Sequence, residues 1–344
     1  MRRLSVRTLP LIALAALAAA VAADLAFARR TAAVPNAGIV IVQTNLAYQD
    51  ASAAGTGMVL TSSGEVLTNN HVIHGATSIK VVVPQAHRTY TATVAGYAVG
   101  ADVAVLKLKG ASGLATVTLG DSSTLRVGAQ VRAVGNAQGR GVLATATGTV
   151  TGLRRSITAS DGESGGERLT GLVETNAALQ PGDSGGPLLD SAGRVVGMNT
   201  AASASFTFRS AANVSYAIPI NKARTLVRQI EAGRSSATVH IGDTAFLGVS
   251  VAAATSSGYP SGYGDAAPVG AVVAGVVQGS PAERLGLSAG DTITALDGHG
   301  VASANEIVSR LLRKTPGKPI SITWLDSFGT SHTAVVALAS GPPQ

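Results

Sequence analysis

Short runs rich in Val, Thr, Ile and Leu recur from Ala37 to about Ile220, separated by Gly, Ser, Asn and Asp. Strands favour these side chains, and runs at such close spacing indicate an all-β barrel or sandwich. Most of the runs are too short to be helices. The clearest cover residues 38–43, 56–60, 79–83, 103–108, 130–134 and 195–199. Because aromatic residues make up only 3% of the chain and Gly numbers 41, we expect cores of small aliphatic side chains joined by tight turns.

A helix is predicted at the end of this first region. Asn221 is a good N-cap, and Gly233 ends the helical pattern. Between them, an apolar stripe at helical spacing is formed by Ala223, Leu226, Val227 and Ile230. The helix closes a domain that we place at residues 37–232, and the small, polar residues that follow predict a linker over 233–244.

A second domain, over residues 245–340, is predicted to be small and α+β. Ser303 and Glu306 form a capping-box pattern in front of an apolar stripe, which predicts a helix that ends before Pro316. Strands are expected near residues 272–277, 292–296 and 320–324. At about 150 residues per domain, the chain of 344 residues has room for two packed cores.

The first 28 residues have the pattern of an export signal. Three arginines precede an apolar run over 9–23, and Ala26-Phe27-Ala28 has the small-x-small form of a signal peptidase site. Spanning a bilayer takes about 20 apolar residues, and only Asp24 separates the run from that length, so an uncleaved membrane anchor is the alternative. Either outcome places the rest of the chain outside the cytoplasm, whether secreted, periplasmic or in the cell envelope.

Composition argues against several function classes. The chain has no Cys, which excludes a disulfide framework, a thiolate metal site and a cysteine nucleophile. The net charge of +7 falls only to +5 without residues 1–28, which carry three Arg and one Asp, and no run of like charges remains to follow a phosphate backbone. We therefore expect no nucleic-acid partner. His74 follows His71 by three residues but lacks the Glu of a zinc-protease helix, so no metal and no cofactor is predicted.

The strongest chemical signal is Gly182-Asp183-Ser184-Gly185-Gly186-Pro187, in which glycines permit a tight turn that presents the serine hydroxyl. A serine becomes an effective nucleophile when a histidine takes its proton and a carboxylate orients that histidine. His71 follows one apolar run, and Asp102 begins another. Each feature alone also fits an ordinary turn or strand end. Their order, His71, Asp102, Ser184, is one in which this triad recurs, so together they favour acyl-transfer chemistry.

Motifs along the whole first region together resemble those of the HtrA/DegP-like serine proteases. They are Gly55-Thr56-Gly57, Thr68-Asn69-Asn70-His71-Val72, Asp102-Val103-Ala104-Val105-Leu106, Leu119-Gly120-Asp121-Ser122, Gln180-Pro181-Gly182-Asp183-Ser184-Gly185-Gly186-Pro187 and Tyr216-Ala217-Ile218-Pro219. The resemblance implies a chymotrypsin-like double β-barrel followed by a PDZ domain, exported from a bacterium and acting in protein quality control or processing. It also implies that His71 is the general base, Asp102 its orienting acid and Ser184 the nucleophile. The oxyanion hole would be made by the backbone N–H groups of Gly182 and Ser184.

The resemblance also indicates a substrate pocket. In the chymotrypsin-like fold its floor lies six residues before the nucleophile, which is Ala178 in this chain. Without an acid there, a Lys or Arg side chain has no counter-ion, so a small or aliphatic P1 residue is expected. Two positions depart from the family's pattern. Asp183 stands where many members have Asn, and residues 135–140 lack the usual Pro and aromatic residue after Asn136, which affects the leaving-group side.

In the second domain, Phe246-Leu247-Gly248-Val249 resembles the carboxylate-binding loop of PDZ domains. Consecutive N–H groups in such a loop capture a peptide C-terminus, and the strand expected over 249–253 pairs with the peptide. The helix after Ser303 would line this groove. Two roles stay open for Phe246, the lip of the groove or part of the domain core.

We therefore expect an exported, ATP-independent serine endopeptidase that cleaves unfolded or exposed polypeptides, with a PDZ domain that binds peptide C-termini and regulates activity. A peptide-binding, chaperone-like envelope protein with little or no proteolysis is the alternative, and an esterase is a third hypothesis. The intact triad argues against the binding protein, and the PDZ-like region argues against the esterase. Family resemblance implies a homotrimer, but the segment before the first run is short, so the oligomeric state stays open.

Overall fold

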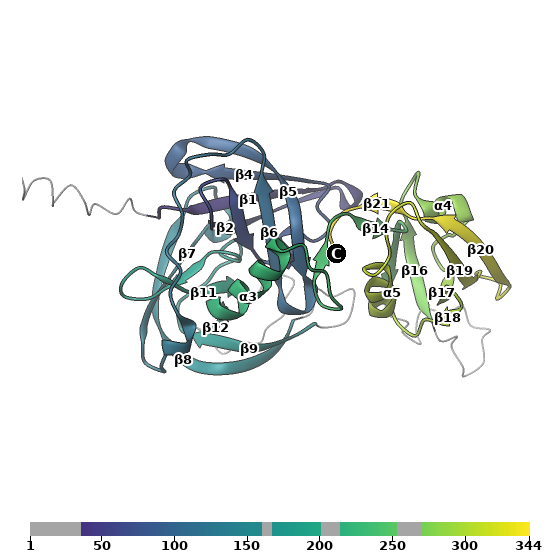
Figure 1. Ribbon diagram of the computed structural model, residues 1–344. Helices are drawn as coiled ribbons and strands as arrows, with labels where there is room; N and C mark the ends of the chain where they lie inside the picture. The colour runs from purple at the N-terminus through teal and green to yellow at the C-terminus, as the bar shows by residue number, and fades with distance from the viewer. Residues whose placement is uncertain (1–35, 160–166, 201–213, 253–269) are drawn as a thin grey trace, which may run out of the picture. The chain divides into compact units, whose positions relative to one another are not determined.

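The computed structural model describes residues 36–159, 167–200, 214–252 and 270–344. Strands dominate these residues, as the sequence predicts, and the helices are short (Figure 1). The predicted export segment, residues 1–28, lies outside the described residues. Within the described ranges, no helix is long and apolar enough to cross a membrane.

The first barrel carries the first six strands. Their bounds are β1 (Ile39–Leu46), β2 (Ala51–Val59), β3 (Glu65–Thr68), β4 (Ser78–Val83), β5 (Arg88–Ala98) and β6 (Val103–Leu108). They pair in the order β5-β4-β1-β2-β3-β6, and an antiparallel β5–β6 pairing closes the ring. Helix α2 (Asn70–Ile73) follows β3, and single-turn helices η1 (Ala47–Gln49), η2 (Pro84–Ala86) and η3 (Val99–Ala101) connect other strands.

The second barrel is closed in the order β10-β11-β12-β9-β8-β7. Its strands are β7 (Gln130–Gly135), β8 (Ala144–Ala159), β9 (Glu167–Thr175), β10 (Pro187–Leu189), β11 (Val195–Thr200) and β12 (Ser215–Pro219). Two more single-turn helices, η4 (Ser122–Thr124) and η5 (Ala137–Gly139), lie before and after β7. The predicted double β-barrel is thus confirmed.

Helix α3 (Ile220–Glu231) corrects one prediction, because Asn221 is not its N-cap. The helix begins one residue earlier, after Pro219, and the Asn221 side chain donates to Asp121 Oδ1 at 2.7 Å. The apolar stripe is confirmed, since α3 packs into a core that strands of both barrels share. This core includes Met58 and Val105 of the first barrel, Leu172 and Met198 of the second, and Ala223, Val227 and Ile230 of α3.

The second domain is a mixed helix and sheet structure, as expected. Its sheet has the order β15 (Val249–Ala252), β16 (Ala271–Val276), β17 (Thr292–Leu296), β19 (Pro319–Leu325) and β20 (Ser331–Ala337), and β18 (His299–Gly300) pairs with β17. The helices are α4 (Pro281–Leu285) and α5 (Ala304–Leu311). Ser303 caps α5 as predicted, accepting a hydrogen bond from Glu306 N–H at 3.3 Å.

Short strand pairings and hydrogen bonds involve the predicted linker and the last residues of the chain. In the predicted linker, β13 (His240–Ile241) pairs with β5. Strand β14 (Thr244–Phe246) pairs with β21 (Ala339–Gly341). Beyond β21, the main-chain oxygen of Pro343 accepts from Gly75 N–H at 2.8 Å, and that of Gln344 accepts from the Asn70 side chain at 3.0 Å. The residues after β21 therefore contact the segment that contains α2.

Candidate active site

His71 lies in α2, and Asp102 lies between η3 and β6 with a left-handed backbone (φ 53°). The ring nitrogen Nδ1 of His71 is 3.0 Å from both carboxylate oxygens of Asp102, and the His71 main-chain N–H donates to Oδ1 at 3.1 Å. An Nδ1–H held by the carboxylate places the basic lone pair of the imidazole on Nε2. The pair thus has the geometry of a general base and its orienting acid.

Asp102 is 4% exposed and is held by residues that the sequence reasoning missed. The Thr200 hydroxyl donates to Asp102 Oδ2 at 3.0 Å, and the Asn69 side chain donates to the Asp102 main-chain oxygen at 2.9 Å. Burial lowers the pKa of Lys222 on α3, and the charge of Asp102 offsets part of this shift. A buried carboxylate is costly unless it is hydrogen-bonded, and the Thr200 hydroxyl and the His71 main-chain N–H both donate to this one.

Ser184 lies in the turn before β10 and is 4% exposed. Gly182 and Gly185 on either side have left-handed backbones (φ 94° and 83°). A Cβ at Gly182 would lie 2.2 Å from Asn136 O, and one at Gly185 would lie 2.1 Å from Thr56 O. Both positions therefore require glycine for conformation and for space, and the motif is a packed turn.

The structure brings this turn beside the helix of His71. Gly55 on β2 lies between the two, because a Cβ there would be 2.7 Å from the Val72 side chain and 3.3 Å from Ser184 O. Gly185 N–H donates to Asn199 O at 2.9 Å, and the next residue, Thr200, is the one that donates to Asp102. Contributions from both barrels thus meet at the three predicted catalytic residues.

Asp183, the first departure from the family's pattern, is a buried acid whose two carboxylate oxygens differ in their hydrogen bonding. Its Oδ2 accepts from Gln180 N–H at 2.8 Å, whereas its buried Oδ1 has no hydrogen-bond partner among the described residues. Burial raises the pKa of Asp183, and the hydrogen bond from Gln180 offsets only part of that rise. The carboxyl group is therefore harder to ionise than an ordinary aspartate.

The second departure, residues 135–140, contacts the nucleophile turn directly. Gln138 has a left-handed backbone (φ 59°), and its N–H donates to Pro181 O at 2.6 Å. Asn136 holds the loop, since its main-chain oxygen accepts from Gly139 and its side-chain oxygen accepts from Gly141 at 2.7 Å. The unusual sequence thus forms a defined loop that supports one peptide of the turn.

Ala178 lies in the loop between β9 and the nucleophile turn. It is exposed, next to the fully buried Ala177, whose oxygen accepts from Leu179 N–H at 2.8 Å. This tight turn presents the small Ala178 side chain outward. Its role as the floor of a substrate pocket stays a prediction.

The loop predicted to bind peptide C-termini has its carbonyl groups tied to the domain. Leu247 O accepts from Ala282 N–H and Gly248 O accepts from Val277 N–H, both at 2.9 Å. The C=O and N–H of a trans peptide point in opposite directions, so the N–H groups of Gly248 and Val249 face away from these partners. In the described part of the chain, β15 is an edge strand with only β16 beside it, which suits pairing with a peptide.

Phe246 makes a contact that neither of its two predicted roles describes, and both roles stay predictions. Its ring stacks on that of Tyr48 in η1, with centroids 5.3 Å apart and planes at 11°. Leu247, by contrast, is in the domain core at 1% exposure. This ring contact joins the start of the loop to the first barrel, while the Phe246 backbone pairs with Ala339 of β21.

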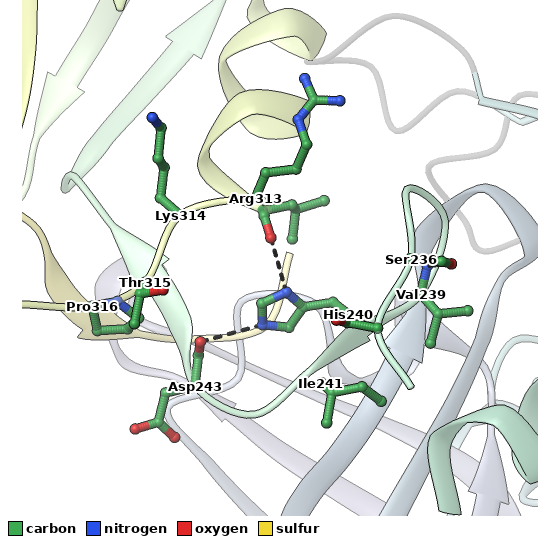
Figure 2. Close-up of a pocket in the computed structure, with 11 residues that line it drawn as sticks. Ser236, Val239, His240, Ile241, Asp243, Arg313, Lys314, Thr315 and Pro316 are labelled. Atoms are coloured by element: carbon green, nitrogen blue, oxygen red, sulfur yellow. Dashed lines mark hydrogen bonds between the residues drawn. The ribbon is translucent and has the colours of Figure 1, made fainter. Parts of the chain in front are cut away.

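A cavity of about 520 Å³ lies apart from these residues, between the predicted linker and the chain after α5 (Figure 2). His240 borders it, with Nδ1 3.1 Å from Leu312 O and Nε2 3.3 Å from Asp243 O. None of the predicted catalytic or peptide-binding residues lines this cavity. Across the described ranges, no group of three or more His, Asp or Glu side chains is arranged to hold a metal ion.

Comparison with known proteins assigns two parts of the chain to families. Residues 55–198 match the trypsin-like peptidase domain, and residues 245–325 match the PDZ domain. The first match contains all three predicted catalytic residues, and the second contains the predicted carboxylate-binding loop.

Whole-chain comparisons give the same result. The chain is 31% identical over 315 residues to the serine protease PepD of Mycobacterium tuberculosis, an alignment that covers 87% of this chain and 63% of that protein. It is 36% identical over 286 residues to a probable periplasmic serine protease do/HhoA-like of Haemophilus influenzae, covering 83% of this chain and 58% of that protein. The chain thus matches less than two thirds of either relative's length. Among solved structures, the HtrA-type protease AlgW with tripeptide is 30% identical, with a TM-score of 0.50, and covers 90% of this chain and 97% of its own.

Proposed function

Because this chain belongs to the HtrA/DegP family of serine proteases, we propose that it is an ATP-independent serine endopeptidase acting through His71, Asp102 and Ser184. The observation that carries the proposal is the His71–Asp102 pair, with Nδ1 3.0 Å from both carboxylate oxygens. We place the peptidase domain at residues 37–232, the linker at 233–244 and the PDZ domain at 245–340.

In the proposed reaction, Ser184 Oγ attacks the scissile carbonyl carbon while His71 Nε2 takes the hydroxyl proton. Asp102 keeps Nδ1 protonated and stabilises the imidazolium that forms. The N–H groups of Gly182 and Ser184 bind the oxyanion of the tetrahedral intermediate. His71 then gives its proton to the leaving amine as the peptide bond breaks. Water, deprotonated by His71, releases the acyl group and restores Ser184.

The decisive experiment compares the purified protein with its Ser184→Ala variant. We expect the parent to cleave an unfolded protein and to be labelled by a fluorophosphonate, and the variant to do neither while remaining folded by circular dichroism. A folded parent that shows neither activity contradicts the proposal and supports a peptide-binding protein without proteolysis. Turnover of small esters without peptide cleavage supports an esterase.

Substrates of this class are unfolded or exposed polypeptides, because a scissile carbonyl reaches Ser184 only in an extended segment. With Ala178 at the floor of the substrate pocket, small or aliphatic P1 residues fit best. Mass spectrometry of the fragments from an unfolded protein measures this preference. The variant Ala178→Asp supplies a counter-ion and is expected to shift cleavage toward Lys and Arg. An unchanged preference removes Ala178 from the pocket.

The PDZ domain is proposed to bind peptide C-termini through the N–H groups of residues 246–249 and to regulate the peptidase. The direction of the Gly248 and Val249 N–H groups, away from Ala282 and Val277, supports this proposal. Fluorescence anisotropy with one peptide in free-acid and amidated forms tests it. Binding of the free acid alone is expected, and equal binding of both forms contradicts carboxylate capture.

Export is proposed from the N-terminal pattern and from the periplasmic designation of the Haemophilus influenzae relative. N-terminal sequencing of the exported protein distinguishes cleavage after Ala28 from retention of the segment as a membrane anchor. Light scattering after size-exclusion chromatography distinguishes a homotrimer from a monomer.

A further inference from the structure

The turn that carries Ser184 is held by all four successive carbonyl groups of residues 181–184. Each accepts a hydrogen bond: Pro181 O from Gln138 N–H at 2.6 Å, Gly182 O from the Thr56 hydroxyl at 2.7 Å, Asp183 O from Gly186 N–H at 3.0 Å and Ser184 O from Thr56 N–H at 2.8 Å. Thr56 thus supplies two of the four donors, and one of them is its side chain.

The Thr56 hydroxyl is fully buried and its hydrogen-bonding role is fixed by its neighbours. Asn136 N–H donates to Oγ1 at 2.9 Å, so the hydroxyl hydrogen is available for Gly182 O. The Thr56 main-chain oxygen is held in turn by the Thr68 hydroxyl at 2.7 Å. One side-chain oxygen therefore joins β2, the end of β7 and the nucleophile turn.

We infer that Thr56 is a positioning residue for the oxyanion hole, acting through its hydroxyl on the peptide that joins Gly182 to Asp183. The inference rests on the proposed endopeptidase function. The predicted oxyanion donors, the N–H groups of Gly182 and Ser184, lie on either side of this peptide. A peptide group is planar and rigid, so anchoring its oxygen limits rotation of both neighbouring N–H groups. Anchoring matters at Gly182, because a glycine backbone is more permissive than those of the other three residues in 181–184.

The test compares Thr56→Val and Thr56→Ser with the parent in the full chain. Valine has the same shape and keeps the main-chain N–H bond to Ser184 O, but its methyl group cannot bind or approach Gly182 O as the hydroxyl does. Serine keeps the hydroxyl. Thr44→Val is the matched control, because Thr44 is a 3% exposed threonine of β1 whose hydroxyl donates to Ala53 O, within the strands of the first barrel.

For Thr56→Val we expect kcat on an unfolded protein substrate to fall about 10- to 100-fold with little change in KM, below the roughly 100- to 1,000-fold loss on removing an oxyanion donor itself. The rate of fluorophosphonate labelling should fall similarly, while the final labelled fraction, which counts folded sites, stays at the parent level. Thr56→Ser should recover most of both rates, and Thr44→Val should keep them.

Three outcomes overturn the inference: parent-like rates in Thr56→Val, an equal loss in Thr44→Val, or a lower final labelled fraction without a lower rate constant. The last result indicates a purely structural role. A parent that is inactive and unlabelled refutes the proposed function itself, and is thereby distinguished from a failure of the inference about Thr56.

Discussion

The Thr200 hydroxyl donates to Asp102 Oδ2 at 3.0 Å, so the acid that orients His71 is itself oriented by the last residue of β11. Both side chains are buried, Asp102 at 4% and Thr200 at 7% exposure. Hydrogen bonds to buried charged groups are stronger than those between neutral groups, since little water competes for the acceptor. The second barrel therefore contributes to the geometry of a pair supplied by the first.

Replacing Thr200 by valine should impair catalysis while leaving the fold intact. A hydrogen bond to a charged group contributes about 1.5–3 kcal/mol, so we expect kcat/KM to fall about 10- to 100-fold. Thr200→Ser keeps the hydroxyl and should recover most of the loss. Steady-state kinetics on an unfolded protein measures both variants. Equal loss in the serine and valine variants would show that the methyl contact, and not the hydrogen bond, is required.

Asp183 should destabilise the folded protein at neutral pH. Burial raises its pKa, so the folded state favours the protonated acid. Its contribution to stability is present below the ordinary pKa of 3.8 and is lost as the pH rises through the raised folded value. Asp183→Asn should therefore increase the free energy of unfolding at pH 7 by about 1–3 kcal/mol, because one buried oxygen is unpartnered. This increase in the free energy of unfolding should become smaller at acidic pH.

Asp190→Asn is the control, and we expect it to change the stability in the opposite direction. Burial alone would raise the pKa of Asp190, but hydrogen bonds from Arg194 and Ala192 and the charge of Arg194 outweigh it and lower the pKa. Its contribution is present above the ordinary pKa and lost in acid, so this variant should be less stable than the parent at pH 7. Denaturant unfolding at several pH values measures both, and a destabilised Asp183→Asn at pH 7 would contradict the assignment.

The sequence predicts the triad and most strands because these depend on local patterns. Ser184 is flanked by glycines whose need is visible in the motif, and Ser303 caps α5 as its spacing with Glu306 predicts. Thr56 lies in the Gly55-Thr56-Gly57 motif, but no local pattern indicates what its hydroxyl, or that of Thr200, binds. Their hydrogen bonds to Gly182 and Asp102 span 126 and 98 residues and depend on how the strands of the two barrels pair. Asn221 shows the opposite error, since a good capping residue lies inside the first turn of α3.

Two tyrosines on β5 should respond differently to removal of the hydroxyl group. The Tyr97 oxygen is 2.9 Å from Thr244 Oγ1 and accepts from Gln344 N–H at 3.3 Å, whereas the buried Tyr90 oxygen has no partner among the described residues. Tyr97→Phe should cost about 1–3 kcal/mol of stability, and Tyr90→Phe should be neutral or stabilising. Denaturant unfolding of the two variants side by side measures the difference. Equal effects would contradict the described hydrogen bonds of Tyr97.

Burial also raises the pKa of Tyr97, outweighing its hydrogen bonds with Thr244 and Gln344. The contribution of the phenol to stability is therefore complete below its ordinary pKa of 10.0 and is lost as the pH rises through the higher folded value. Alkaline unfolding curves should show a steeper loss of stability for the parent than for Tyr97→Phe. Parallel curves would remove Tyr97 as the responsible group.

Gly341 on β21 should be required for both stability and peptide binding, because a Cβ there would lie 2.3 Å from Phe246 Cβ and 2.4 Å from its Cγ. The backbone of Gly341 is not left-handed, so a larger residue is excluded there only by lack of space. Overpacking of this kind costs about 1–3 kcal/mol, and the displaced Phe246 begins the loop proposed to bind peptide C-termini. Gly341→Ala should therefore lower both the free energy of unfolding and the affinity for a free-acid peptide.

Gly300→Ala on β18 is the matched control, since nothing lies within 4 Å of a Cβ there, and it should change neither. Parent-like stability and binding in Gly341→Ala would show that the β14–β21 pairing can shift without affecting the loop.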